Sequence, residues 1–191
     1  MRFKIVLLLI FLICHLKGMS QQKFEREYRM KSSEIPEPAR KFINETLSNS
    51  RIKWLGEESL NGKSIEAKGV SSGRLYSIEF DTSGNLQDVE IKIRFSEMDT
   101  ALQTLVKSYL EKEFVRYRVV KVQRQLKGDR EILKNVILGR ENNQSHQINY
   151  EIEVRGRNKE GVNLFELLFN TKGELLKSAK VVQRNSSHLI N

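Results

Sequence analysis

The sequence contains very little cysteine, proline or histidine: one Cys, two Pro and three His in 191 residues. The single cysteine, Cys14, lies in the apolar N-terminal run, so the rest of the chain has no disulfide, thiolate ligand or cysteine nucleophile. His146 and His188 each stand alone in a polar segment, without a second ligand at metal spacing. No zinc site and no other metal or cofactor site is therefore predicted.

Motifs of catalysis are also lacking. No serine occupies a nucleophile elbow, and no glycine-rich phosphate loop is present. Neighbouring acids such as Glu57 and Glu58, or Glu151 and Glu153, lie on segments that alternate as sheet surface. Glycoside hydrolysis needs a cleft between two carboxyl groups, which this pattern does not predict. The sequence predicts a protein that is not an enzyme.

Long runs of one charge are missing, although the formal net charge is +9. Basic and acidic residues are interspersed, and no five like charges follow one another. A mixed, solvated surface explains this pattern, so no nucleic-acid partner is predicted. The densest basic stretch, 116–127, could meet an acidic partner or anionic headgroups, and the alternative is an ordinary exposed strand edge.

The N-terminus has the pattern of a secretory signal peptide. Arg2 and Lys4 precede an apolar run over 5–16, and small residues follow at Gly18 and Ser20. Cleavage is predicted near Ser20/Gln21, which gives a periplasmic or secreted protein without a transmembrane segment in the mature chain. An uncleaved anchor and a lipoprotein are the alternatives.

Two segments of the sequence are similar to each other. Residues 64–89 read SIEAKGVSSGRLYSIEFDTSGNLQDV, and residues 150–177 read YEIEVRGRNKEGVNLFELLFNTKGELLK. Each copy alternates as two strands do and contains a turn of the form F-(D/N)-x-x-G-x-L. The turn after Phe80 superficially resembles a calcium loop, but no bidentate glutamate follows at the required distance. We therefore predict tight turns with glycine at positive φ.

The first copy belongs to a unit that begins with a helix. Residues 21–33 are polar and aperiodic and predict a mobile arm. Pro36 and Pro38 then open a helix whose apolar face includes Phe42. Strands are predicted at 51–60, 64–68, 75–81 and 86–95, with a hairpin turn at Asn61-Gly62.

The second unit follows the same order with one insertion. Ser96 is the predicted N-cap of a second helix, with Asp99 in the capping-box position. A strand around Val122 follows, and residues 129–140 add a short amphipathic helix. Further strands are predicted at 147–155, 163–170 and 174–182, the last with a bulge.

These elements predict an α+β fold. Each unit is a helix followed by a four-stranded antiparallel meander, repeated in tandem, with the helices on one face of the sheets. The other face is charged and expected to be open to solvent. The predicted divisions are a signal peptide (1–20), a mobile arm (21–33), repeat 1 (34–95), repeat 2 (96–183, with the inserted helix near 129–140) and a tail (184–191).

The order of these motifs resembles a known family. It runs from Ile35-Pro36 through the Trp54 strand to YSIEFDTSGNL at 76–86, then to YEIEV at 150–154 and FELLF at 165–169. This order is similar to that of the PepSY-like, β-lactamase-inhibitory-protein-like exported proteins of Gram-negative bacteria. The resemblance covers about 33–180, and the inserted helix departs from it. It implies a tandem α+β repeat, an envelope or secreted location, and protein binding or inhibition by analogy.

The leading hypothesis is thus a non-enzymatic exported binding module. Its partner would be an envelope or secreted protein, and it could inhibit an envelope enzyme such as a peptidase. The alternative is a module that binds a small molecule, lipid or glycan of the envelope through the basic stretch 116–127. Trp54 is either a core residue or an interface anchor. The candidate binding residues are Glu66, Lys68, Glu79, Lys92, Arg94, Glu153, Arg155 and Trp54.

Overall fold

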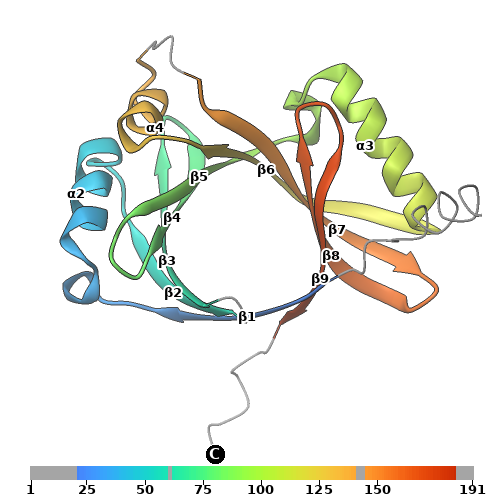
Figure 1. Ribbon diagram of the computed structural model, residues 1–191, viewed down its shortest axis with the longest axis horizontal. Helices are drawn as coiled ribbons and strands as arrows, with labels where there is room; N and C mark the ends of the chain where they lie inside the picture. The colour runs from blue at the N-terminus through green and yellow to red at the C-terminus, as the bar shows by residue number, and fades with distance from the viewer. Residues whose placement is uncertain (1–20, 60–61, 141–144, 184–191) are drawn as a thin grey trace, which may run out of the picture.

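A computed structural model describes residues 21–59, 62–140 and 145–183 of the chain. Its nine strands form one sheet that closes into a barrel, with neighbours in sequence order. Successive strands pair antiparallel, and the first and last close the ring as a parallel pair (Figure 1). The strands are β1 (Gln21–Arg29), β2 (Lys53–Ser59), β3 (Gly62–Ser71), β4 (Arg74–Asp81), β5 (Leu86–Ile93), β6 (Arg116–Lys127), β7 (Gln147–Asn158), β8 (Gly161–Asn170) and β9 (Leu175–Gln183).

The predicted tandem of two four-stranded units is wrong, because all strands belong to a single sheet. The two halves are joined by the pairing of β5 with β6, in which Ile91 lies opposite Arg124. They are joined again where β1 pairs with both β2 and β9. Alternation of polar and apolar residues assigns each strand its two faces, but it does not specify which strands lie side by side.

The segment predicted as a mobile arm forms β1, followed by a short 3-10 helix, Ser32–Glu34. Strand pairing supplies the backbone hydrogen bonds that an isolated polar segment would lack. Tyr28 lies opposite Gly56 of β2, and its ring occupies the space where a Cβ of residue 56 would be. Glycine at this position therefore lets the β1–β2 seam close.

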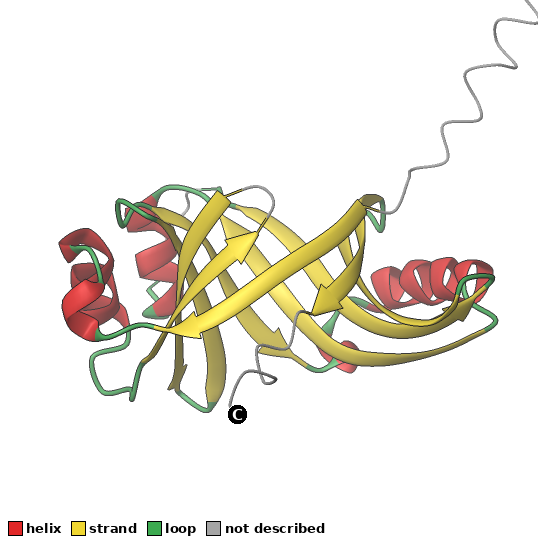
Figure 2. Ribbon diagram, turned by 90° about the horizontal axis from the view of Figure 1, so that it is seen from below, coloured by secondary structure: helices red, strands yellow, loops and turns green. Residues whose placement is uncertain are grey.

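In the described part of the chain, three α-helices lie outside the barrel (Figures 1 and 2). They are α2 (Glu37–Thr46), α3 (Thr100–Glu113) and α4 (Arg130–Ile137), which confirms the helices predicted from sequence. The N-cap of α3 is Asp99 and not Ser96: its carboxylate accepts from the amides of Ala101 and Leu102 at 2.9 and 3.3 Å. The predicted cap was displaced because Phe95–Glu97 forms a 3-10 helix before it.

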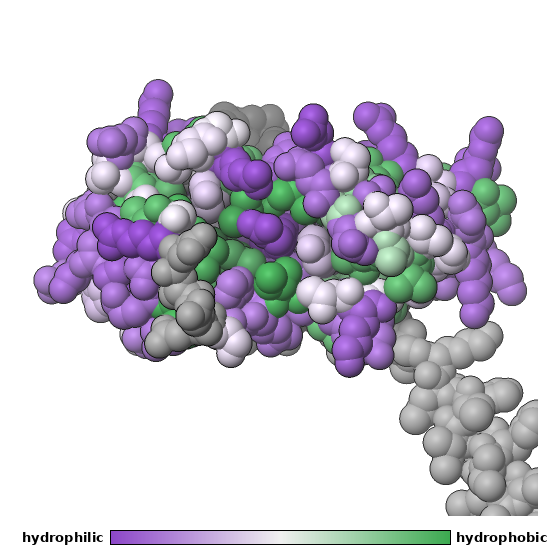
Figure 3. All heavy atoms as spheres, turned by 90° about the horizontal axis from the view of Figure 1, so that it is seen from above, coloured by the Kyte–Doolittle hydropathy of each residue, from purple (hydrophilic) through white to green (hydrophobic). Residues whose placement is uncertain are grey.

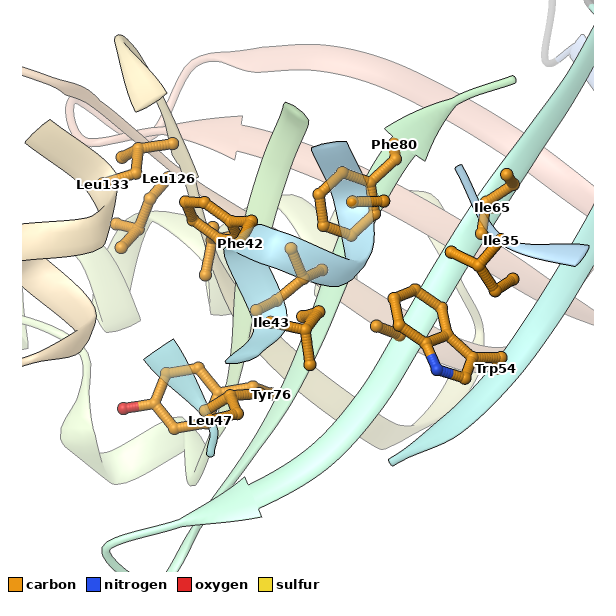
Figure 4. Close-up of a cluster of buried hydrophobic side chains, with 14 of the residues drawn as sticks. Ile35, Phe42, Ile43, Leu47, Trp54, Ile65, Tyr76, Phe80, Leu126 and Leu133 are labelled. Atoms are coloured by element: carbon orange, nitrogen blue, oxygen red, sulfur yellow. The ribbon is translucent and has the colours of Figure 1, made fainter. Parts of the chain in front are cut away.

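The hydrophobic core is found between these helices and the outer face of the barrel. In the first cluster, Phe42 of α2 packs edge-on against Phe80 of β4, with ring centroids 5.9 Å apart (Figure 4). Leu133 of α4 completes this cluster. In the second, Tyr109 of α3 packs edge-on against Phe169 of β8 at 5.4 Å. The helices thus cover the apolar outer face of the barrel, and the apolar side chains of the core do not fill its inner face.

The two predicted tight turns are confirmed. Asp81 Oδ1 accepts from the amides of Ser83 and Asn85, and Asn170 Oδ1 accepts in the same way from Lys172 and Glu174. The turn glycines, at 84 and 173, have φ of 87° and 78°. The predicted bulge in the last strand is also present, where the β8–β9 register shifts. Asn61 of the predicted hairpin turn lies outside the described residues, although β2 and β3 pair as expected.

Candidate functional site in the barrel lumen

Strand alternation places polar side chains on the inner face of the barrel. On β4, Tyr76, Ile78 and Phe80 point outward into the first core cluster. Ser77 and Glu79 point the other way, as β-strand geometry requires. The sequence therefore assigns the faces of this strand correctly. The face predicted to be open to solvent is instead the wall of a closed lumen.

Two adjoining cavities, of about 110 and 360 Å³, occupy this lumen. They share one set of charged residues, contributed by six different strands. This set, which we call the central belt, contains five carboxylates and one lysine. Its members are Lys23, Glu57, Glu79, Glu90, Glu151 and Glu166.

Four lysines neutralise part of the carboxylate charge. Lys23 Nζ lies 2.7 Å from Glu166, and Lys68 Nζ lies 2.8 Å from Glu66. Lys121 pairs closely with Glu153, and Lys127 lies 3.6 Å from Asp88. Burial lowers the pKa of Lys23, but the neighbouring carboxylates, with Glu166 foremost, more than offset this, so its pKa is raised. The pKa values of Lys68 and Lys121 are raised too, so these two lysines and Lys23 remain charged at neutral pH.

Four carboxylates of the lumen hold protons unusually firmly. Burial, followed by the charge of Asp88, raises the pKa of Glu79 to about 8. Burial and the charge of Glu166 raise the pKa of Glu151 to about 7, and burial raises that of Asp88 to about 6. The pKa of Glu90 is raised well above its usual value by burial and by Glu151. Near neutral pH the lumen can thus exchange protons for another positive group.

Amide side chains line the neighbouring part of the wall. Gln123 of β6 donates to Glu90 at 2.7 Å, and Gln125 donates to Asp88 at 3.2 Å. Asn149 of β7 in turn donates to Gln125 at 3.2 Å. These bonds hold the side chains of three adjacent strands in fixed orientations.

The structure brings some of the predicted binding residues together and separates others. Glu66, Lys68, Glu79 and Glu153 all line the lumen. Trp54 lies in the first core cluster, 6.3 Å from the Phe80 ring and only 9% exposed, so its place is in the core and not on a surface. The other three predicted residues are exposed and are not part of the lumen lining: Lys92, Arg94 and Arg155.

Several lumen residues were not among the predicted binding residues. One sequence signal is a polar residue at every second position of a strand whose other positions are apolar. The signal is clear for Asp88 and Glu90 on β5, but on β6 the charged Arg124 lies between Gln123 and Gln125 and obscures it. Lys23 was missed for a different reason, since β1 was not predicted as a strand.

The basic stretch 116–127 does not form one basic surface. It is strand β6, whose side chains alternate between the two faces except at a bulge between Val119 and Lys121. Lys121 points into the lumen and pairs with Glu153, whereas Arg116 and Arg118 are exposed. The structure therefore divides the cations on which the alternative binding surface depended.

No protein-family model matches the chain, and no curated protein matches it either. Solved structures do resemble it. A DUF2874 family protein from Bacteroides ovatus has a TM-score of 0.50 at 14% identity, over 76% of this chain and 87% of its own. A Bacteroides eggerthii protein for which a periplasmic location has been suggested has a TM-score of 0.51 at 14% identity, over 76% and 88%. At these identities the likeness concerns the fold alone.

A BLIP-like protein from Bacteroides fragilis is also similar, with a TM-score of 0.46 at 18% identity, over 81% of this chain and 92% of its own. Neither this similarity nor those above assigns a partner or an activity to the chain. Among the described residues, no helix combines the length and apolarity needed to cross a bilayer. The predicted signal peptide and the tail at 184–191 lie outside the described residues, so export stays a prediction.

Proposed function

We propose that this protein is an exported binding module, not an enzyme, whose lumen receives a positively charged group. The observation that carries this proposal is the central belt, where five carboxylates from separate strands face one lysine. An ammonium or guanidinium group would replace protons that burial favours on Glu79, Glu90 and Glu151. The gain would be large because the charges interact in a low-dielectric interior.

The lumen differs from the active site of a glycosidase. That chemistry uses one acid and one base or nucleophile on either side of a substrate. Here the acids form a ring, and several are already paired with lysines, as in Lys23–Glu166. This arrangement supports binding and orientation of a charge rather than transfer of a proton in a reaction.

Two sources could supply the positive group. The protein partner predicted from the sequence would insert a lysine or arginine side chain, and a free polyamine would supply an ammonium group directly. The 360 Å³ cavity, lined at its outer part by Lys63, Lys127 and Lys177, is large enough for one such side chain. These rim lysines would also attract a carboxylate on the same ligand.

Isothermal titration calorimetry tests this proposal with three probes: a short peptide with one central lysine, the same peptide with norleucine there, and spermidine. We expect the lysine peptide or spermidine to bind and the norleucine peptide not to bind. Preference for the peptide would indicate a protein partner, and preference for spermidine a small ligand. Binding of the norleucine peptide with equal affinity, or no binding by any probe, would contradict the proposal.

A pair of variants locates the site. Glu151→Gln removes one belt carboxylate and should weaken binding about tenfold or more, since loss of a buried charge partner is costly. Glu111→Gln makes the same chemical change on the exposed side of α3 and should leave the affinity unchanged. Binding near pH 7 should also release protons, which the dependence of the heat on buffer ionisation enthalpy measures.

A further inference from the structure

Three carboxylates converge on one wall of the lumen. Glu79 of β4 lies directly opposite Asp88 of β5, and Glu90 follows two residues later on the same face of β5. One oxygen from each lies within 4.8 Å of the other two. Like charges directly opposite one another destabilise a strand pair, so this wall requires compensation.

The basic side chains around these acids compensate them only in part. Lys127 Nζ lies 3.6 Å from Asp88 Oδ2, and this lysine is exposed. Glu90 receives a neutral amide, that of Gln123. Within the described ranges, no lysine or arginine forms a salt bridge with Glu79. The three carboxylates therefore share one lysine.

Two buried oxygen atoms on the same wall have no hydrogen-bond partner: Asp88 Oδ1 and Gln123 Oε1. Their residues are only 4% and 5% exposed. Nε2 of Gln123 lies 2.7 Å from Glu90, so Oε1 of the same amide borders the carboxylate cluster. Buried polar atoms are nearly always satisfied, and those left unpaired cost about 1–3 kcal/mol each. Both unpaired atoms are acceptors, so a cation would satisfy them.

We propose that Glu79, Asp88 and Glu90, together with Oε1 of Gln123, form a calcium site in the lumen wall. Calcium binds oxygen ligands at about 2.3–2.6 Å, so ligands on opposite sides of the ion lie roughly 4.6–5.2 Å apart. The three carboxylate oxygens all lie within 4.8 Å of one another, so one ion of this size could contact all three. Magnesium, at about 2.0–2.1 Å, would need a tighter set. Water molecules complete the coordination.

This inference deepens the proposed function, because the ion would be one positive group held by the lumen. The two sites share Glu79 and Glu90, but the variants that test them are separate: Asp88 of β5 lies outside the central belt, whereas Glu151 belongs to the belt and lies on β7. Failure of one proposal is therefore distinguishable from failure of the other.

Calorimetric titration of the purified protein with CaCl₂, after treatment with a chelator, tests the site. We expect one site with a Kd on the order of 10⁻⁴ M, in the range of weak calcium sites. The Tm should rise by about 5 °C in 10 mM calcium. Asp88→Asn should weaken binding at least tenfold and reduce the rise in Tm by about half or more.

The matched control is Glu153→Gln, which removes a lumen carboxylate outside the proposed donors and should retain calcium binding. Asp88→Asn keeps the shape of the side chain, and its circular dichroism spectrum and Tm without calcium report whether it folds. Absence of calcium binding by the wild-type protein would overturn the proposal. So would an equal loss of affinity in both variants, or a magnesium affinity as high as that for calcium.

Discussion

The outer and inner faces of the barrel differ although the same strands form both. On β4, Phe80 points outward under α2 and is fully buried among aromatic rings. Its neighbour Glu79 points inward among other carboxylates. In this protein the helices and the outer face of the sheet form the hydrophobic core, and the lumen has no such role. The lumen can therefore carry charges that a packed core would exclude.

The outer surface of the molecule is mixed in character. Hydrophilic and hydrophobic side chains are interspersed over the face shown in Figure 3. Hydrophilic side chains thus also lie on this outer face, and the inner face is distinguished by the burial of its charged groups. Burial is what turns ordinary glutamates into groups with strongly raised pKa values.

The largest effect should come from the outer face. Phe80→Ala removes a fully buried ring that contacts Phe42 and Trp54. We expect it to lower the free energy of unfolding by about 3–5 kcal/mol, as measured by urea denaturation. The neighbouring change Glu79→Gln should cost little or even stabilise the protein. An equal loss in both variants would contradict the division of roles between the faces.

The second largest effect should come from the inner face, whose carboxylates should make the Tm depend on pH. The folded-state pKa values of Glu79 and Glu151, about 8 and about 7, lie above the usual value of 4.5. The folded protein therefore binds more protons than the unfolded chain between pH 4.5 and 8, so stability is lost as pH rises through this window. We expect the Tm, measured with a chelator present, to fall by roughly 5 °C from pH 5 to pH 9.

A double variant provides the control for this pH dependence. With Glu79→Gln and Glu151→Gln combined, the Tm should change much less between pH 5 and pH 9. Lys23, Lys68 and Lys121 do not contribute in this range, since their pKa values are raised above the usual 10.5. A Tm that rises with pH in the wild-type protein would show that the lumen acids are not buried as described.

A smaller effect is expected at the seam that closes the barrel. Gly56→Ala places a methyl group against the ring of Tyr28, and overpacking of this kind costs about 1–3 kcal/mol. Adding Tyr28→Ala should restore part of the loss because it removes the clash. Chemical denaturation of the three variants forms a double-mutant cycle. Strictly additive losses would indicate that the two residues do not meet.

The smallest effect should occur on the exposed surface. Lys92→Glu changes an exposed side chain and should alter the free energy of unfolding by less than about 0.5 kcal/mol. Lys121→Met is the half-buried counterpart: it leaves Glu153 without its partner and should be more destabilising. Thermal denaturation at one pH compares them. A larger loss for Lys92→Glu would place the important charges outside the lumen.

Much of the local structure could be predicted from the sequence. The prolines at 36 and 38, the apolar spacing around Phe42 and the two F-(D/N)-x-x-G-x-L turns each determine their own conformation. The faces of β4 were likewise assigned correctly, because Tyr76, Ile78 and Phe80 alternate with Ser77 and Glu79. Each of these signals depends only on residues close together in the sequence, and each predicted the conformation of its own segment correctly.

The closure of the barrel could not be predicted in this way. It depends on β1, whose residues carry no clear periodicity, and on its parallel pairing with β9 at the far end of the chain. Without closure, Glu66 and Glu79 appear as exposed surface, and with it they line an interior. A binding site in the lumen is thus a consequence of topology, and alternation alone predicts only which residues share a face.

The most direct test of a lumen that receives positive charge is an NMR titration of the ¹⁵N-labelled protein with the single-lysine peptide and with spermidine. We predict that one of these probes shifts the backbone amides of Glu79, Glu90 and Glu151, while amides on α3, such as that of Glu111, stay in place. Shifts confined to the helices or to exposed residues such as Lys92 and Arg155, or no shifts with either probe, would contradict the account.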